Sequence, residues 1–263
     1  MRVFLMGATK FSRRCLDAVL ESGQEFCGCA ATPEHFDISY APEGVRNVNY
    51  CNFVEVAGEF GVPCIAYDRK NVNSFVDEVR ELQPDLLLVA GWYYIVPKKL
   101  RDVAPQGAVG LHGSLLPQFR GGAPLVWTMI HGESHGGMTL FYLDDGVDTG
   151  DIVGQQSFPI DENETIADAL VSSENAAVTL LLECLPQLAD DSAPRISQSE
   201  AQASEFPQRC PADGEIDWTK PAADIGNFIR AQTRPYPGAF LRINGKKVVI
   251  WDADISELEE DCA

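Results

Sequence analysis

A histidine, an aspartate and two glycine-containing loops are concentrated between residues 111 and 151 of this 263-residue chain. His112 follows a short apolar run, and Asp148 lies in the acidic turn DDGVDTGD. A histidine can accept a proton, and a neighbouring carboxylate orients the ring and favours its protonated form. Together the two residues would suit deprotonation of an amine that attacks a carbonyl carbon.

Both side chains are expected at the ends of strands. Residues 108–112 are predicted to form a strand that ends at His112, and residues 138–143 a strand that precedes the acidic turn. Residues 113–122 are rich in Gly, Pro and Ser and are predicted to form a loop. Ligands of open α/β sheets gather beyond the carboxyl ends of strands, so we expect His112 and Asp148 to meet there.

The first half of the chain alternates strand-like and helix-like segments. We expect strands at 2–6, 25–32, 63–67 and 85–90, helices at 11–21, 53–60, 71–82 and 123–131, and a long polar loop at 33–52. This alternation is typical of a parallel sheet. The predicted fold class is therefore α/β, a Rossmann-like doubly wound and mostly parallel sheet with a small C-terminal α+β subdomain.

The second half supplies candidate domain boundaries. A strand at 151–159 precedes a long helix at 165–185, where Thr165 and Asp168 fit an N-terminal cap. Residues 189–204 are polar and small, which is typical of a linker. We therefore predict a catalytic domain at 1–188, a linker at 189–204 and a small C-terminal domain at 205–263. That last domain is expected to contain a strand at 215–218, a helix at 221–233 and a hairpin at 238–243 and 246–251 that turns at Asn244-Gly245.

Composition excludes several classes of protein. With 39 acidic and 20 basic residues, the net charge of -19 opposes binding of a nucleic acid. A phosphorylated small molecule is still compatible with this charge, because a local arginine pocket can dominate within about 10 Å. The eight cysteines form no C-x-x-C pair, so we expect free thiols and no metal. No segment approaches the roughly 20 apolar residues of a membrane span, so we expect no membrane partner and a cytoplasmic location, with 257–261 as a solvated acidic tail.

Two other candidate motifs are weak. The first strand-to-helix turn, MGATKFS, has one glycine and lacks the G-x-G-x-x-G of dinucleotide sites. Ser114 lacks the G-x-S-x-G context of a hydrolase nucleophile. The loop at 91–97, GWYYIVP, is more informative, because flat heteroaromatic ligands bind against such aromatic walls. The alternative is that these aromatic side chains merely cover the edge of the sheet.

Taken together, the motifs of this chain resemble those of the folate-dependent formyltransferases. The resemblance rests on H-G-S-L-L-P-x-x-R-G from His112, followed by D-T-G-D from Asp148. The stretch PDLLLVAGWYYIVP is similar to the pterin-side strand and loop of that family. Near the C-terminus, DGEIDW and RAQTRPYPGAF resemble the small domain of the aminoarabinose formyltransferases.

The resemblance implies transfer of a formyl group from N10-formyltetrahydrofolate, without a metal, to an amine. His112 and Asp148 match two members of the family's catalytic Asn, His and Asp, whereas the position of the asparagine is Gly110. Three alternatives follow. Another donor replaces the asparagine amide, such as protonated His112 or a backbone N–H; or turnover is slow; or the chain binds a folate without transferring its formyl group.

The resemblance also implies binding residues. For the folate these are Gly91, Trp92, Tyr93, Tyr94, Ile95, Leu115, Leu116 and Asp144. For the amine substrate they are Met6, Gly7, Thr9, Ser114 and Arg120. Arg120, Arg230 or Arg234 could meet a phosphate, with Arg120 the first choice, and the alternative for each is a structural salt bridge.

The acceptor is expected to be a small molecule. Residues 205–263 carry seven basic and eleven acidic side chains, a net of -4, which opposes tRNA. The C-terminal signature instead favours an amine on a nucleotide-linked sugar, with another small amine, a deformylase-like activity or plain folate binding as alternatives. A homodimer is compatible with the resemblance.

Overall fold

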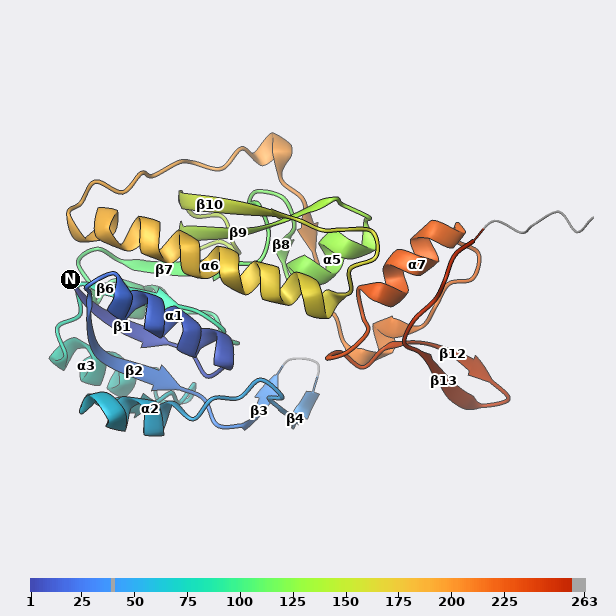
Figure 1. Cartoon of the computed structure of the whole chain (residues 1–263). Coiled ribbons are helices and arrows are strands. Elements are labelled where there is room, and N and C mark those ends of the chain that lie inside the picture. Colours follow the sequence, from blue (N-terminus) through green and yellow to red (C-terminus); the bar gives the residue numbers. More distant parts are fainter. Residues whose placement is uncertain (39–40, 257–263) are drawn as a thin grey trace, which may run out of the picture.

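A seven-stranded sheet forms the centre of the computed structural model, which describes residues 1–38 and 41–256 (Figure 1). The strands lie in the order β10-β9-β7-β6-β1-β2-β5. The parallel strands are β1 (Arg2–Met6), β2 (Glu25–Ala31), β5 (Cys64–Ala66), β6 (Leu86–Val89) and β7 (Ala108–His112). The antiparallel strands β9 (His135–Tyr142) and β10 (Ile152–Pro159) complete one edge. The prediction of a mostly parallel α/β sheet is confirmed.

Helices cover both faces of this sheet, as expected for a doubly wound fold. They are α1 (Lys10–Glu21), α2 (Phe53–Phe60), α3 (Val72–Glu81), α4 (Lys98–Arg101), α5 (Pro124–Ile130) and α6 (Ile166–Ala189). One core contains side chains of α1, α2, α5 and α6, and the other contains side chains of α3 and α4. Strands β1 and β6 contribute to both cores, because Val3, Phe4, Leu86 and Leu87 are all fully buried. These unbroken apolar runs are typical of central parallel strands.

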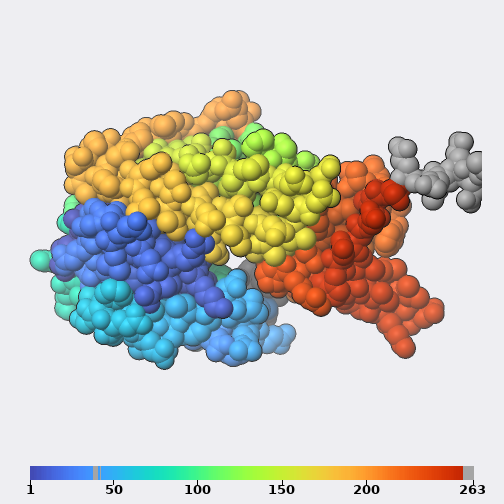
Figure 2. All heavy atoms as spheres, viewed as in Figure 1, coloured from blue at the N-terminus to red at the C-terminus, as the bar shows by residue number. Residues whose placement is uncertain are grey.

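The C-terminal part contains α7 (Ala222–Arg230) and the hairpin of β12 (Ala239–Ile243) and β13 (Lys246–Ile250). It projects from one end of the sheet domain, in red in Figure 2. The hairpin turns at Asn244 and Gly245, whose φ angles of 49° and 74° are those of the turn that an Asn-Gly pair favours. The predicted hairpin is therefore confirmed.

Three sequence-based expectations for secondary structure were wrong. Residues 33–52, expected as a loop, contain the antiparallel pair β3 (His35–Ile38) and β4 (Ala41–Arg46), held partly by Phe36, which is buried against Tyr93. Residues 215–218, expected as a strand, form one bridge between Glu215 and Phe240, because the Asp217 side chain turns the chain at Thr219. Helix α6 passes its expected end at 185 and reaches Ala189, because buried Leu188 continues its apolar face.

The segment after α6 lies against the sheet domain. Ile196 bridges to Ile152 at the start of β10, a short helix η1 spans Glu200–Gln202, and β11 (Glu205–Phe206) pairs with β8 (Arg120–Gly121). A second short helix, η2 (Pro211–Gly214), follows. The acidic residues 257–261 lie outside the described residues. Among those described, no helix has the length and apolar character to cross a membrane.

Candidate active site

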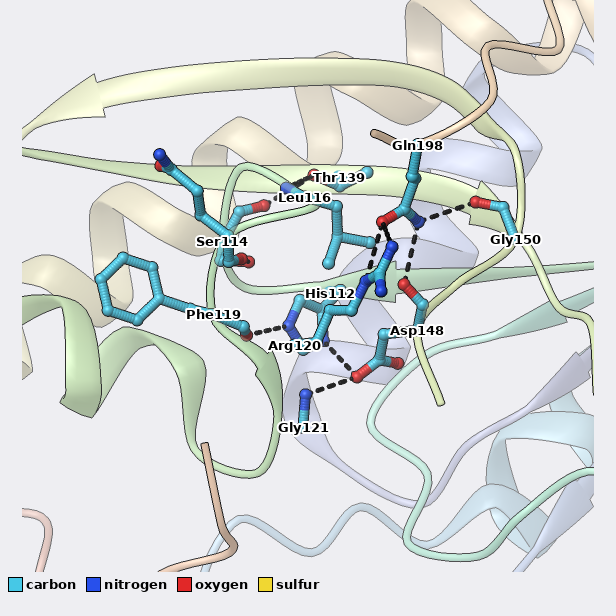
Figure 3. Close-up of polar contacts among 11 residues, drawn as sticks. His112, Ser114, Leu116, Phe119, Arg120, Gly121, Thr139, Asp148, Gly150 and Gln198 are labelled. Atoms are coloured by element: carbon cyan, nitrogen blue, oxygen red, sulfur yellow. Dashed lines mark hydrogen bonds and ion pairs between the residues drawn. The ribbon is translucent and has the colours of Figure 1, made fainter. Parts of the chain in front are cut away.

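His112 ends β7, as predicted, and is almost entirely buried. Its ring lies between two loops (Figure 3). Nε2 is 2.8 Å from the carbonyl oxygen of Phe119, and Nδ1 is 3.5 Å from Oδ2 of Asp148. A carbonyl oxygen can only accept, so Nε2 carries the hydrogen of the neutral ring. Nδ1 is then the unprotonated nitrogen and faces the carboxylate.

The backbone around this histidine adopts unusual conformations. Phe119 and Asp148 have φ angles of +56° and +55°, in the left-handed region that side chains other than glycine rarely occupy. Phe119 thereby presents its carbonyl oxygen to the ring, and Asp148 its carboxylate. Such conformations persist where surrounding contacts determine them, and they are frequent at functional sites.

Asp148 is fixed by a second contact. Its Oδ2 accepts a hydrogen bond from the backbone N–H of Gly121 at 2.9 Å, so one oxygen faces both Gly121 and His112. Within the same loop, Oδ1 of Asp144 accepts from the N–H of Gly146 and the hydroxyl of Thr149. The expectation that His112 and Asp148 meet is therefore met by the geometry, and Asp144 shapes the turn that leads to Asp148.

The chemistry that this pair can perform follows from its charges. The 3.5 Å between Nδ1 and Oδ2 exceeds the length of an ordinary hydrogen bond, about 2.7–3.2 Å. In the neutral ring Nδ1 holds a free lone pair and can accept a proton, and the resulting imidazolium faces the carboxylate. This arrangement suits a general base that the Phe119 carbonyl orients through Nε2 and that Asp148 stabilises once it is protonated.

The loop after His112 is fastened to the sheet by buried polar side chains. The hydroxyl of Ser114 donates to the carbonyl of Gln118 at 2.6 Å, and that of Thr139 donates to the carbonyl of Ser114 at 2.6 Å. Gln155 donates to Leu116 O and Thr139 Oγ1. Ser114, predicted to bind substrate, is buried and bonded inside the protein. Its neighbours Leu115 and Leu116 pack against Gly137 and Phe141.

Arg120 is buried, and its guanidinium is already occupied. It donates to Oε1 of Gln198 at 3.0 and 2.9 Å, and to both carboxylate oxygens of Glu200 at 3.1 and 2.9 Å. The hydrogen bonds from Arg120 to Glu200 hold the pKa of the Glu200 carboxyl below its usual range. Gln198 also donates to the carbonyls of Asp148 and Gly150 at 2.9 and 2.8 Å (Figure 3). The arginine that we expected to meet a phosphate instead joins the two loops of the site.

Gly110 lies two residues before His112 on β7. A Cβ atom built at this position would be 2.9 Å from Cδ2 of Leu143 and 3.4 Å from Cε1 of Phe141. The space beside Gly110 is therefore filled by apolar side chains. No side-chain donor is available from this position.

The first strand-to-helix turn is used mainly for packing and capping. Met6 is fully buried, and Thr9 caps α1 by accepting from the N–H of Ser12. The N–H of Lys10 donates to the carbonyl of Asn49 at 2.8 Å, so part of this helix end is already occupied. A Cβ atom at Gly7 would meet Ser12 at 2.5 Å, which explains the glycine.

The aromatic loop after β6 gathers around Tyr67. Gly91 begins it with φ +62°, and a Cβ atom there would meet the Thr9 hydroxyl at 2.3 Å, so only glycine fits. Trp92 packs edge-on against the ring of Tyr67, and the ring of Tyr94 stacks on the same Tyr67 ring. Burial raises the pKa of the Tyr67 and Tyr94 hydroxyls. The ring contacts of these three residues do not include His112, whose ring contacts Phe141. Ile95, in the same loop, is largely exposed.

Two cavities lie near these elements. One, of about 680 Å³, lies at the carboxyl ends of β2 and β5 and is lined by Tyr94, Tyr67, Phe36, Arg69 and Thr32, whose buried hydroxyl has no partner. The other, of about 540 Å³, is lined by Asp144, Leu143, Tyr142, Arg101 and Gln106. Arg101 Nε and Gln106 Oε1 are buried there without a partner. His112 lines neither cavity, but the loop of Asp144 also carries Asp148.

The two C-terminal arginines differ. Arg230 donates to the carbonyls of Asp161 and Glu164, each at 3.0 Å, and so fastens α7 to the sheet domain. Arg234 is exposed and lies over the ring of Trp251 at 4.5 Å. Of these two, Arg234 is the one whose charge faces solvent.

Sequence reasoning missed the residues that hold His112 and Asp148 in place. Phe119 and Gly121 act through backbone groups, which leave no mark on a sequence pattern. Gln198 lies in the polar stretch that we predicted to be a linker, fifty residues after Asp148. No spacing rule connects these positions.

Two family models match the chain. The model described as "Formyl transferase" matches residues 3–185, and "Formyl transferase, C-terminal domain" matches residues 210–263. Among solved structures, a methionyl-tRNA formyltransferase from Clostridium thermocellum is 18% identical, with a TM-score of 0.65 over 97% of this chain and 94% of that one. An N-formyltransferase from Helicobacter canadensis, solved with folinic acid and dTDP-3-aminofucose, is 19% identical, with a TM-score of 0.69 over 94% and 86%. A sugar N-formyltransferase from a Shewanella species is 18% identical, with a TM-score of 0.71 over 98% and 99%.

Proposed function

Since this chain belongs to the formyl transferase family, we propose that it transfers a formyl group from N10-formyltetrahydrofolate to the primary amine of a nucleotide-linked amino sugar. Membership of the family supports the class of reaction, formyl transfer. The identity of the amine that accepts the formyl group is the part that we propose. It is motivated by the C-terminal signature and by the fold shared with sugar N-formyltransferases.

The observation that carries this proposal is the contact between His112 and Asp148. The Phe119 carbonyl fixes the hydrogen on Nε2, which leaves Nδ1 as the proton acceptor. Asp148 stands 3.5 Å from Nδ1, where it stabilises the cation that forms. An amine becomes acidic only as it attacks, so a base placed at the site of attack accelerates the step, typically by about 10²–10⁴-fold.

The reaction then requires few groups. The amine nitrogen attacks the formyl carbon, and its proton passes to Nδ1 of His112. The bond between the formyl carbon and N10 breaks, and N10 takes up the proton that His112 held. Asp148 keeps its negative charge throughout and balances the imidazolium. Gly110 contributes no side-chain donor, so negative charge on the formyl oxygen is met by His112 itself or by a backbone N–H.

We assign the pterin of the folate to the cavity of about 540 Å³. Its volume is in the range of small-molecule sites, about 300–1,000 Å³. The unpartnered Nε of Arg101 and Oε1 of Gln106 supply one donor and one acceptor, and a pterin carries both kinds of group. The predicted folate residue Asp144 lines this cavity. The predicted folate residue Tyr94 lines the other cavity, where its ring could stack on the rest of the folate.

Charge favours a small acceptor over tRNA. A phosphate backbone requires a basic surface, whereas residues 205–263 carry seven basic and eleven acidic side chains, a net charge of -4. The exposed guanidinium of Arg234 could still meet a single diphosphate. The division into residues 1–188, 189–204 and 205–263 and a homodimer stay predictions.

Gly110 motivates a second candidate, a protein that binds the folate without passing its formyl group to an amine. The apolar filling beside Gly110 removes the side-chain donor that the family's asparagine provides. Hydrolysis of N10-formyltetrahydrofolate to formate would be the deformylase-like form of this candidate.

One experiment separates these functions. The protein is incubated with N10-formyltetrahydrofolate and a panel of nucleotide-linked amino sugars and other small amines, and both formyl amide and formate are quantified. We expect the amide to form with at least one amino sugar and to disappear in His112→Ala. Formate without amide supports the deformylase-like candidate. Binding of a stable folate analogue without either product supports folate binding alone.

A further inference from the structure

The segment 196–206, which we call the strap, fastens both loops of the candidate site. At its start, Ile196 bridges to Ile152, and the Ser197 hydroxyl donates to Asp151 at 3.0 Å. At its end, the Ser204 carbonyl accepts from the N–H of Arg120 at 2.9 Å. The strap therefore bonds to the loop of Asp148 at one end and to the loop of Arg120 at the other. Composition alone had predicted a linker over most of it.

Gln198 is the side chain of the strap that reaches both loops at once. Its Nε2 donates to the carbonyl oxygens of Asp148 and Gly150 at 2.9 and 2.8 Å. Its Oε1 accepts from Nε and one terminal nitrogen of Arg120, at 3.0 and 2.9 Å. Figure 3 shows this amide between Arg120 and the Asp148 loop. All the hydrogen-bonding groups of the amide are therefore used by the site.

These bonds form a closed ring that includes Asp148. Arg120 donates to Gln198, Gln198 donates to the carbonyl of Asp148, and the carboxylate of Asp148 accepts from Gly121, the residue after Arg120. Asp148 is thus held at both its main-chain and its side-chain oxygen.

The conformation of Asp148 explains why it needs such support. A non-glycine residue at φ +55° stays there only when its surroundings over-determine it. Release of its carbonyl would let the peptide rotate to an ordinary conformation, and the carboxylate would turn with it. A shift of about 1 Å in a reacting group can lower a rate about 100-fold.

We infer that Gln198 is a positioning residue, which acts on the reaction only through Asp148 by holding the peptide that aims the carboxylate at His112. This inference rests on the proposed function for its kinetic part. Its structural part stands without that function, because the Asp148 carboxylate is also detected through Gly121. The two parts can therefore fail separately.

The main variant is Gln198→Met, which keeps the length of the side chain and removes all four hydrogen bonds. Gln198→Glu is the second variant; it keeps an oxygen for Arg120 and loses both donors to the Asp148 loop, so it serves if the first fails to fold. The matched control is Glu200→Gln. Glu200 also bonds Arg120, but its side chain is 77% exposed and makes no described contact with the Asp148 loop.

The kinetic readout is a double-mutant comparison of kcat with Asp148→Asn. We expect Gln198→Met to lower kcat about 10- to 100-fold with KM for the folate changed less than about 3-fold. The double variant should be within about 2-fold of Asp148→Asn alone, since the inference makes the effect of Gln198 on kcat pass through the Asp148 carboxylate. Multiplied losses in the double variant, or an unchanged kcat in Gln198→Met, would overturn the inference.

The structural readout is the backbone amide of Gly121, followed by NMR chemical shift and hydrogen exchange. We expect Gln198→Met and Asp148→Asn to move this resonance in the same direction and to accelerate its exchange about 10-fold or more, while Glu200→Gln leaves both unchanged. If Gln198→Met leaves the amide as in the wild type, the inference is wrong, whatever the enzyme does. If the amide moves as expected and no formyl amide ever forms, the positioning stands and the proposed function fails.

Discussion

Asp148 brings its carboxylate to within 3.5 Å of Nδ1 of His112 from a loop that follows a different strand. The two residues lie 36 positions apart, and the same carboxylate oxygen accepts from Gly121. In the neutral ring the nitrogen that faces Asp148 is the one without hydrogen, because Nε2 donates to the carbonyl of Phe119. These two contacts orient the ring before substrate arrives.

Removal of the charge on Asp148 should slow the reaction while the fold is retained. Asparagine keeps an oxygen for the Gly121 N–H, but it no longer stabilises an imidazolium. We expect Asp148→Asn to lower kcat about 100- to 1,000-fold, with the melting temperature nearly unchanged. Asp151→Asn, at the end of the same loop, is the control and should retain most of the activity. A wild-type kcat in Asp148→Asn would remove the carboxylate from the mechanism.

Restoration of the family's asparagine at Gly110 should be hindered by Leu143. A Cβ atom 2.9 Å from Cδ2 of Leu143 requires that side chain to move, so Gly110→Asn should destabilise the protein by about 1–3 kcal/mol in urea unfolding. The same substitution should cost clearly less in a Leu143→Ala background. Equal costs in both backgrounds would show that Leu143 is not the obstacle.

Gly110→Asn also tests whether the space beside Gly110 is needed by a bound ligand. We expect affinity for a stable folate analogue to change less than about 3-fold in Gly110→Asn, measured by calorimetry. Loss of binding would mean that the ligand itself needs the room beside Gly110.

The contact between His112 and Asp148 was expected from the sequence, because both residues follow apolar runs, but the expected reason was wrong. Both were placed at carboxyl strand ends on one edge of the sheet, whereas β9 runs antiparallel to β7 and its end at Tyr142 pairs with Val109 at the start of β7. Asp148 reaches His112 because the loop after β9 carries it back to the other end of β7. The main strands and helices could be predicted because their apolar periodicity reports burial. The hairpin β3/β4 could not, because its pairing depends on Phe36 reaching the aromatic loop at Tyr93.

The contacts that hold His112 and Asp148 in place could not be predicted from the sequence. Arg120 was recognisable within its motif, but its partner Gln198 lies 78 residues away in a stretch without periodicity. Its role is set by a long-range hydrogen bond, and such contacts arise only once the strap has folded back on the loops. The sequence allowed Arg120 to be either a structural salt-bridge partner or a phosphate ligand, but it could not identify Gln198 and Glu200 as the partners.

The aromatic loop should contribute to folate binding through Tyr94. Its ring stacks on Tyr67 and lines the cavity of about 680 Å³. Loss of an aromatic contact of this kind is worth about 0.5–1.5 kcal/mol, so Tyr94→Ala should weaken a folate analogue about 3- to 10-fold. Tyr94→Phe keeps the ring and is the control. If the nucleotide weakens instead of the folate analogue, this cavity belongs to the amine substrate.

The N-terminal cap of α6 should stabilise the protein less as the pH falls. The Thr165 hydroxyl and N–H donate to Asp168 and lower the pKa of that carboxyl. A folded pKa below the unfolded value of about 3.9 stabilises the protein above that pH, and the effect is lost as the pH falls through the folded pKa. Asp168→Ala should therefore cost about 0.5–1 kcal/mol at pH 7 and less at pH 3, by urea unfolding. Glu183→Ala, at an exposed position away from the cap, is the control for the loss of a carboxylate from the same helix.

Transfer of a labelled formyl carbon tests the central claim most directly. N10-formyltetrahydrofolate labelled with ¹³C in the formyl group is mixed with a nucleotide-linked amino sugar, and the label is followed by NMR in the wild type and in His112→Asn. We predict that the wild type moves the label into a formamide on the sugar nitrogen, and that in His112→Asn the label stays on the folate. Label that appears as formate, or a formamide that forms equally well in the variant, would contradict an amine formyl transfer that depends on His112 and Asp148.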